Sequence, residues 1–149
     1  MRRGWLRRVV VLACLVGGAG AMLMVLNPAP EVPESGDVVG TLPYVVKLHA
    51  RWCPICMTTR DAWATVQNAY VGRVRFVVFD FTSASTTEAS RAQARRLGLD
   101  AVFDEYEGET GTVLVLDGES RAVRHALHGR RDAAEYRAVI DAALEGMHK

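Results

Sequence analysis

The sequence predicts an α/β domain that follows an apolar N-terminal segment and a proline-rich linker. Short apolar runs typical of buried strands alternate with stretches of helical periodicity, which gives the order β-α-β-α-β-β-α after the linker. The last two strands are separated by Asp117-Gly118, a dipeptide typical of a hairpin turn. At 149 residues the chain can hold one domain and a short additional segment.

The N-terminal segment carries the positive charge of this chain. Its first 26 residues contain four arginines and no acid, so the remainder has 14 basic and 17 acidic residues and a net charge of −3. A nucleic-acid-binding domain would need a clustered basic face. We therefore expect no nucleic-acid partner.

Residues 9–26 form an apolar run of eighteen residues behind the arginines, the pattern of an export signal. The run continues past the small residues Ala19-Gly20-Ala21, which favours an uncleaved signal anchor over a cleaved signal peptide. Cys14 lies within the run and is expected to be one of its apolar residues. Arginines before the span place the domain outside the cytoplasm. The expectation is a single-pass protein of the cell membrane with a periplasmic domain; cleavage would instead release that domain into the periplasm.

The domain itself is expected to span residues 42–149. Residues 27–41 contain Pro28, Pro30 and Pro33, and we interpret them as an extended linker. Within them, Val38-Val39 could add a short edge strand.

The first half of the domain contains two predicted central strands and two predicted helices. Residues 44–49 and 74–81 are almost continuously apolar, which indicates strands buried on both faces. One helix is expected to run from Cys53 to Tyr70. The next is expected to start with a capping box of Ser85 and Glu88 and to end at Gly98.

The second half starts with an acidic stretch, residues 99–111, which we interpret as a solvated loop; the alternative is a partner-recognition surface. Residues 112–116 and 121–128 are the strands of the predicted hairpin. Asp132 with Glu135 is expected to cap a last helix with one apolar face.

The segment Trp52-Cys53-Pro54-Ile55-Cys56 is the candidate active site. The chain has three cysteines, too few for a framework of several disulfides, and a Cys53–Cys56 bridge closes too short a loop to add much stability. Cys53 falls at the expected N-cap with Pro54 at the first helical position, where the helix end favours a thiolate. Cys56 lies one turn later. We predict that Cys53 is an exposed nucleophile, Cys56 the resolving thiol, and Trp52 a shield and apolar platform for a partner peptide.

Residues 45–56, together with the element order, resemble the thioredoxin superfamily. The resemblance extends over about a hundred residues, through the strand at Phe76, the hairpin and the last helix. It implies a central mixed β-sheet flanked by helices, with the dithiol at a helix start, and the activity of a protein disulfide oxidoreductase. The N-terminal segment and the linker resemble those of membrane-tethered members that act outside the cytoplasm.

The sequence departs from the thioredoxin pattern at three positions. Lys47 replaces an acid that accepts a proton from the resolving thiol; the lysine could lower the pKa of Cys56, or extend out of the sheet edge. His49 replaces an aromatic residue and is expected to be packed and hydrogen-bonded, with proton transfer as the alternative. The family's cis-proline is absent: Thr110 is the candidate for the position facing the dithiol, with Gly111 the alternative. A cis bond there would cost about 3 kcal/mol, so a trans loop is the other possibility.

The expected function is thiol–disulfide exchange on exported proteins, with electrons from a membrane donor or a partner thiol protein and without a cofactor. Because no histidine lies between the cysteines, we expect a moderately reducing or intermediate potential. One alternative is a zinc or copper site that combines the cysteines with His49, or with His125 and His128, although those two histidines should point to opposite faces of a strand. The other is a redox-inert binding module.

Overall fold

The computed structural model describes residues 42–146. The predicted signal segment, the linker and the strand at Val38-Val39 lie outside these residues. Within the described part of the chain, no helix is long and apolar enough to cross a membrane. The elements are β1 (Tyr44–His49), α2 (Pro54–Thr58), α3 (Arg60–Ala69), β2 (Arg75–Asp80), α4 (Ala84–Leu97), α5 (Asp100–Glu105), β3 (Thr112–Leu116), β4 (Val123–His128) and α6 (Ala133–Gly146).

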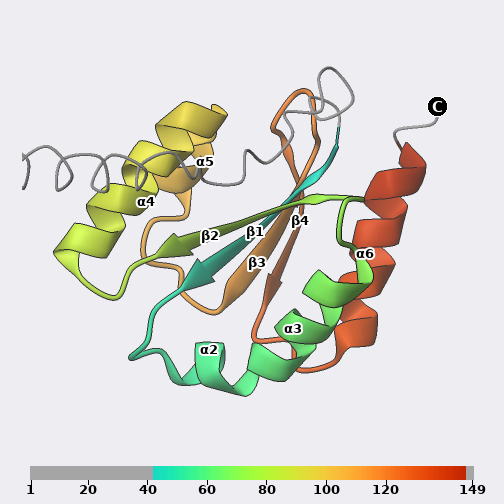
Figure 1. The fold of residues 1–149 in the computed structure, drawn as a ribbon, viewed down its shortest axis with the longest axis horizontal. Coiled ribbons are helices and arrows are strands. Elements are labelled where there is room, and N and C mark those ends of the chain that lie inside the picture. The colour runs from blue at the N-terminus through green and yellow to red at the C-terminus, as the bar shows by residue number, and fades with distance from the viewer. Residues whose placement is uncertain (1–41, 147–149) are drawn as a thin grey trace, which may run out of the picture. The chain divides into compact units, whose positions relative to one another are not determined.

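The strands form one mixed sheet in the order β2-β1-β3-β4 (Figure 1). β1 pairs in parallel with β2 and antiparallel with β3, and β3 pairs antiparallel with β4. The first five residues of β1 are buried, because this strand has a neighbour on each side and helices on both faces. The predicted α/β fold with a mixed sheet flanked by helices is confirmed.

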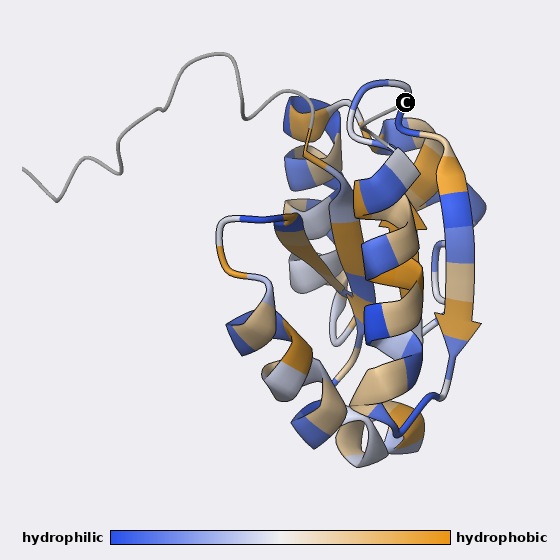
Figure 2. Cartoon of the chain, turned by 90° about the vertical axis from the view of Figure 1, so that its right-hand side faces the viewer, coloured by the Kyte–Doolittle hydropathy of each residue, from blue (hydrophilic) through white to orange (hydrophobic). Residues whose placement is uncertain are grey.

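Alternate residues of the strands divide the core into two halves. Val46, Leu48 and Leu114 pack with residues of α4 and α5 on one face of the sheet. Val45 and Val113 pack with residues of α3 and α6 on the other face. Figure 2 shows how hydrophobic and hydrophilic residues alternate along α6, as expected for a helix with one buried face.

The helix predicted from Cys53 to Tyr70 is two helices, because the chain bends at Thr59. The Thr59 backbone has φ −96° and ψ 0°, outside regular helix geometry. Its buried hydroxyl donates to the carbonyl oxygens of Ile55 at 3.0 Å and Cys56 at 3.4 Å. Threonine side chains that bond back to the preceding turn commonly bend helices.

The start of α4 also differs from the prediction. Ser83, not Ser85, is the N-cap, and its partner in the capping box is Thr86 rather than Glu88. The Ser83 hydroxyl accepts from the Thr86 N–H at 3.2 Å, and the Thr86 hydroxyl oxygen accepts from the Ser83 N–H at 3.0 Å. Gly98 ends the helix in the left-handed conformation, as predicted.

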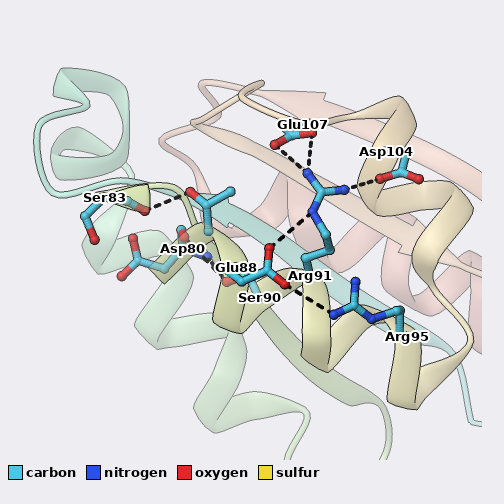
Figure 3. A network of polar contacts seen from close by, with 9 residues as sticks. Asp80, Ser83, Glu88, Ser90, Arg91, Arg95, Asp104 and Glu107 are labelled. Atoms are coloured by element: carbon cyan, nitrogen blue, oxygen red, sulfur yellow. Dashed lines mark hydrogen bonds and ion pairs between the residues drawn. The ribbon is translucent and has the colours of Figure 1, made fainter. Parts of the chain in front are cut away.

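The stretch predicted as an acidic loop contains the short helix α5. Val102 and Phe103 are buried in the core, which holds α5 against the domain. Arg91 of α4 donates to Asp104 at 2.6 Å and to both carboxylate oxygens of Glu107 at 2.8 Å (Figure 3). Its guanidinium also lies 4.7 Å from the centre of the Phe103 ring. Two acids of this stretch, Asp104 and Glu107, therefore bind a partner within the same chain.

The hairpin and the last helix follow the predicted order, with a longer turn. Six residues separate the ends of β3 and β4, and the Asp117 carboxylate accepts the backbone N–H groups of Glu119 at 3.1 Å and Ser120 at 2.8 Å. At the start of α6, the Asp132 carboxylate accepts from the Ala134 N–H at 2.8 Å, as expected of a cap.

Candidate dithiol site

Cys53 and Cys56 lie where the end of β1 leads into α2. Cys53 is the N-cap residue with extended backbone angles, and Pro54 occupies the first turn, as predicted. The Cys56 N–H donates to Cys53 Sγ at 3.2 Å. The Cys53 sulfur therefore does what a capping oxygen does elsewhere, and it lies at the positive end of the helix.

Both thiols are almost completely covered, and both are free. Cys53 is 4% exposed and Cys56 1% exposed. The prediction that Cys53 is exposed is therefore wrong. The two side chains belong to the core cluster on the α4–α5 face of the sheet, and that packing leaves the Cys53 sulfur little accessible surface.

The two thiols differ in acidity. Burial alone would raise the pKa of Cys53, but hydrogen bonds from the Cys56 and Thr110 side chains and from the N–H groups of Cys56 and Ile55 outweigh it, so the pKa is lowered. Burial raises the pKa of Cys56, and the hydrogen bond to Cys53 raises it further, against the charge of Lys47. Cys53 is therefore the thiol that ionises first.

The loop before β3 packs against the dithiol. Thr110 lies near enough to Cys53 for its hydroxyl group to help lower the pKa of that thiol, and it remains the candidate for the position facing the dithiol. No described residue follows a cis peptide bond. Gly111 donates its N–H to the Leu48 carbonyl at 2.9 Å and accepts from the Gly129 N–H at 3.0 Å. These two hydrogen bonds hold the loop across the ends of the strands, next to Ile55.

Solved structures share this architecture, although no protein-family model and no curated protein matches the sequence. A thioredoxin-like protein solved in solution in its oxidised form is 14% identical, with a TM-score of 0.51 over 73% of this chain and 82% of that chain. The fold is thioredoxin-like. A thiol:disulfide interchange protein from Chlorobium tepidum is 22% identical, with a TM-score of 0.49 over 72% of this chain and 82% of that chain. Trxlp from Edwardsiella tarda is 16% identical, with a TM-score of 0.46 over 70% and 84%.

In this thioredoxin-like fold, the loop after β2 supports the segment that carries Trp52. The Trp52 indole N–H donates to the Thr82 carbonyl at 3.3 Å, and the Arg51 N–H donates to the Thr82 hydroxyl at 3.0 Å. Thr82 is itself held by the Asp80 carboxylate, which accepts its N–H at 2.7 Å. Trp52 remains 61% exposed, so its ring is available to a partner. Sequence reasoning missed Thr82, although polar residues after two parallel strands meet at one sheet edge.

Lys47 does not extend out of a sheet edge. β1 is a central strand, and Lys47 is only 5% exposed, with its ammonium 5.2 Å from the centre of the Trp63 ring. Burial lowers the pKa of Lys47, and the charges of Cys56 and Cys53 oppose that shift. Lysine here is therefore a buried cation beside the dithiol.

His49 is packed less completely than expected of a core histidine, and its Nδ1 is buried without a hydrogen-bond partner among the described residues. The expected hydrogen-bonded histidine is thus not observed at that atom. Burial lowers the pKa of His49, Lys47 lowers it further, and Asp80 opposes the shift.

The histidines of β4 do not join the cysteines in a metal-binding group. Within residues 42–146, no three histidine, cysteine or acidic side chains are arranged to hold a metal ion. His128 Nδ1 lies 2.9 Å from the Thr112 hydroxyl, next to the Gly111 loop. His125 borders a different hollow, of about 320 Å³, beside Asp117 and the residue before β1, at the far end of the sheet.

Proposed function

We propose that this protein is a thiol–disulfide oxidoreductase of the thioredoxin superfamily that works through Cys53 and Cys56. One observation carries the proposal: the Cys53 sulfur caps α2 at the positive end of the helix, and its pKa is lowered, while that of Cys56 is raised. A dithiol exchanger needs one sulfur ready to attack as a thiolate and a second one close by. The lowered pKa of Cys53 suits the attacking sulfur, and the raised pKa of Cys56 suits the second one.

The reaction follows from that difference. The Cys53 thiolate attacks one sulfur of a substrate disulfide; a new S–S bond forms, the substrate bond breaks, and its other sulfur leaves as a thiolate. Cys56 then loses its proton to solvent and attacks Cys53 Sγ, which releases the second substrate sulfur. The substrate gains two electrons and two protons, and the dithiol becomes the Cys53–Cys56 disulfide. A donor dithiol restores the reduced state by the reverse exchange.

The proposed substrates are exported proteins with thiols or disulfides, with the domain tethered outside the cytoplasm by the span at residues 9–26. The exposed Trp52 ring beside the sulfurs would contact the partner peptide. The proposed electron source is a membrane protein or a second thiol protein. Nothing in the dithiol chemistry needs a bound cofactor.

The decisive experiment compares Cys53→Ser with Cys56→Ser in a Cys14→Ser background, where only the motif thiols remain. Cys53→Ser should abolish disulfide reduction in an insulin assay, because the attacking sulfur is lost. Cys56→Ser should accumulate mixed disulfides with its natural partners. Equal turnover by the Cys53→Ser variant would exclude the proposed role.

Zinc titration of the reduced protein separates exchange from metal binding. The exchange proposal expects both thiols to remain reactive in the presence of stoichiometric zinc. Tight one-to-one binding with loss of both thiols would instead support the metal-binding alternative, and intact thiols without turnover would support a redox-inert binding module.

A further inference from the structure

A hollow of about 440 Å³ lies on the Cys56 side of α2. Its lining residues are Lys47, His49, Arg51, Cys56, Met57 and Arg60. We call this feature the basic hollow. Its volume is within the range of pockets that hold small ligands or single side chains.

The basic hollow has four basic residues in its wall and no acid. Neither Lys47 nor Arg51 forms an ion pair with a described residue, and Arg60 has only its exposed neighbour Asp61, at 3.7 Å. The other nearby acid is Asp80, whose carboxylate accepts from the Thr82 N–H and whose negative charge partly balances His49 and Arg51. Positive charge therefore predominates in the hollow, and part of it lacks a fixed counter-charge.

One polar atom in the wall is buried without a hydrogen-bond partner among the described residues, and the Lys47 ammonium lies beside an aromatic ring rather than a carboxylate. Lys47 is 5% exposed as a residue, and its ammonium lies 5.2 Å from the centre of the Trp63 ring. His49 Nδ1 is buried with no partner among the described residues. Buried polar groups are nearly always satisfied by protein, water or ligand, so a polar partner from outside the domain is expected at His49 Nδ1.

The hollow also lies close to the proposed chemistry. Cys56 forms part of its wall, and the Cys56 backbone nitrogen is 3.2 Å from Cys53 Sγ. Met57, 62% exposed, adds an apolar rim. The hollow therefore lies within one helical turn of Cys53, the sulfur that the cysteine of a substrate would meet.

We infer that the basic hollow binds a carboxylate, and that the preferred substrates are peptide segments with Asp or Glu next to the reactive cysteine. This inference rests on the proposed function and adds its substrate class. Arginine and lysine pair equally with phosphate, but the group that a peptide carries beside its cysteine is a carboxylate. Opposite charge at such a site mainly sets the choice of partner and the rate of association.

The test compares two disulfide-linked peptides that differ only in Glu or Gln beside the cysteine. The full-length protein should reduce the Glu peptide about fivefold faster at low salt, as expected for a partly exposed ion pair. Arg51→Gln combined with Arg60→Gln should remove most of that preference. Arg96→Gln combined with Arg137→Gln lowers the net charge equally on exposed positions away from the hollow and should keep the preference. Equal rates for both peptides, or the same loss in both double variants, would overturn the inference and leave the exchange function intact.

A second measurement does not depend on turnover. Peptides with Ser in place of Cys should shift the NMR signals of Lys47 and His49 when they carry Glu, and not when they carry Gln. A shift with the Glu peptide in a protein that does not reduce disulfides would support the carboxylate site while refuting the proposed function. The absence of any shift, or a shift with sodium glutamate at the same concentration, would refute recognition of an acidic peptide.

Discussion

A Cβ atom on Gly111 would lie 2.6 Å from Cγ2 of Ile55, the residue immediately before the second cysteine. Gly111 also has a φ of +88°, which side chains rarely adopt. The loop before β3 therefore approaches the Cys53–Cys56 turn as closely as backbone can. Glycine is required here for both space and conformation, immediately after Thr110, the candidate for the position of the family's proline.

Gly111→Ala should therefore destabilise the domain by about 1–3 kcal/mol, through a strained φ and contact with Ile55. The measurement is denaturant unfolding. Gly108→Ala is the matched control, since Gly108 has a φ of +83° but no atom within 4 Å of its added Cβ. Combining Gly111→Ala with Ile55→Ala should remove the contact with Ile55 and recover that part of the lost unfolding free energy. The part caused by the strained φ of residue 111 should remain. If Gly108→Ala costs as much as Gly111→Ala, close packing on Ile55 contributes nothing.

Lys47→Met should make the dithiol more reducing and the oxidised protein more stable. In the oxidised form no thiolate balances the buried ammonium, whereas reduction supplies one, so Lys47 favours the reduced state. We expect a fall in potential on the order of 30 mV, the equivalent of tenfold in the exchange constant, measured against glutathione. Lys47→Arg keeps the charge and should change the potential less. A rise in potential for Lys47→Met would contradict this electrostatic account.

The stability gained by Lys47→Met should also depend on pH. Because the folded pKa of Lys47 lies below its unfolded value of about 10.4, the buried charge costs stability below the folded pKa, and that cost disappears as the pH rises to the unfolded value. The stability advantage of oxidised Lys47→Met should therefore be full at pH 7 and shrink in alkali. Unfolding in urea across this pH range measures the advantage. An advantage that grows with pH would contradict a lowered pKa of Lys47.

Asp117→Asn should cost about 1 kcal/mol at pH 7, similar to the loss of a helix cap, because the carboxylate organises the β3–β4 turn. Hydrogen bonds from the Ser120 backbone and from Arg124 lower the pKa of this carboxyl. Its contribution is present above the unfolded pKa of about 3.9 and is lost as pH falls through the lower folded value. Urea unfolding should show the two proteins converging in strong acid. Glu119→Gln, whose carboxylate makes none of these bonds, should match the parent throughout.

Thr59→Val should destabilise the junction of α2 and α3 by about 1 kcal/mol, since the buried hydroxyl bonds two carbonyl groups and the replacement keeps the shape. The control is Thr58→Val, because Thr58 bonds the same Ile55 carbonyl from an exposed position. Thermal unfolding should show a larger loss for Thr59→Val. Equal losses would mean that burial of the Thr59 hydroxyl is unimportant.

Local patterns in the sequence were sufficient for the strands and for the start of α2. Apolar continuity identifies β1, and a cysteine before a proline identifies the N-cap, because both depend on near neighbours. The features that were missed depend on distant residues. The acidic residues of 99–111 were interpreted as a solvated loop because their partner, Arg91, lies in α4 and is not visible in the stretch itself.

The errors at the candidate site also arise from residues that are distant in the sequence. The apolar run of β1 indicates burial on both faces, but the residue that covers Lys47, Trp63 of α3, is not visible in the strand's own residues. The covering of Cys53 depends on core packing, and its acidity depends in part on Thr110, which lies more than fifty positions later. Sequence thus identifies which side chains carry the chemistry, and tertiary packing decides how accessible and how acidic they are.

The near-complete covering of Cys53 should also limit its oxidation by peroxides. Thiolates with low pKa are oxidised by peroxides to sulfenic and then irreversibly to sulfinic acid, at rates that follow their exposure. At 4% exposure, the Cys53 sulfur combines acidity with protection, since little of its surface is open to a free oxidant. With Cys56 packed one turn behind it, any sulfenic acid that does form has a thiol at hand to convert it into a reducible disulfide.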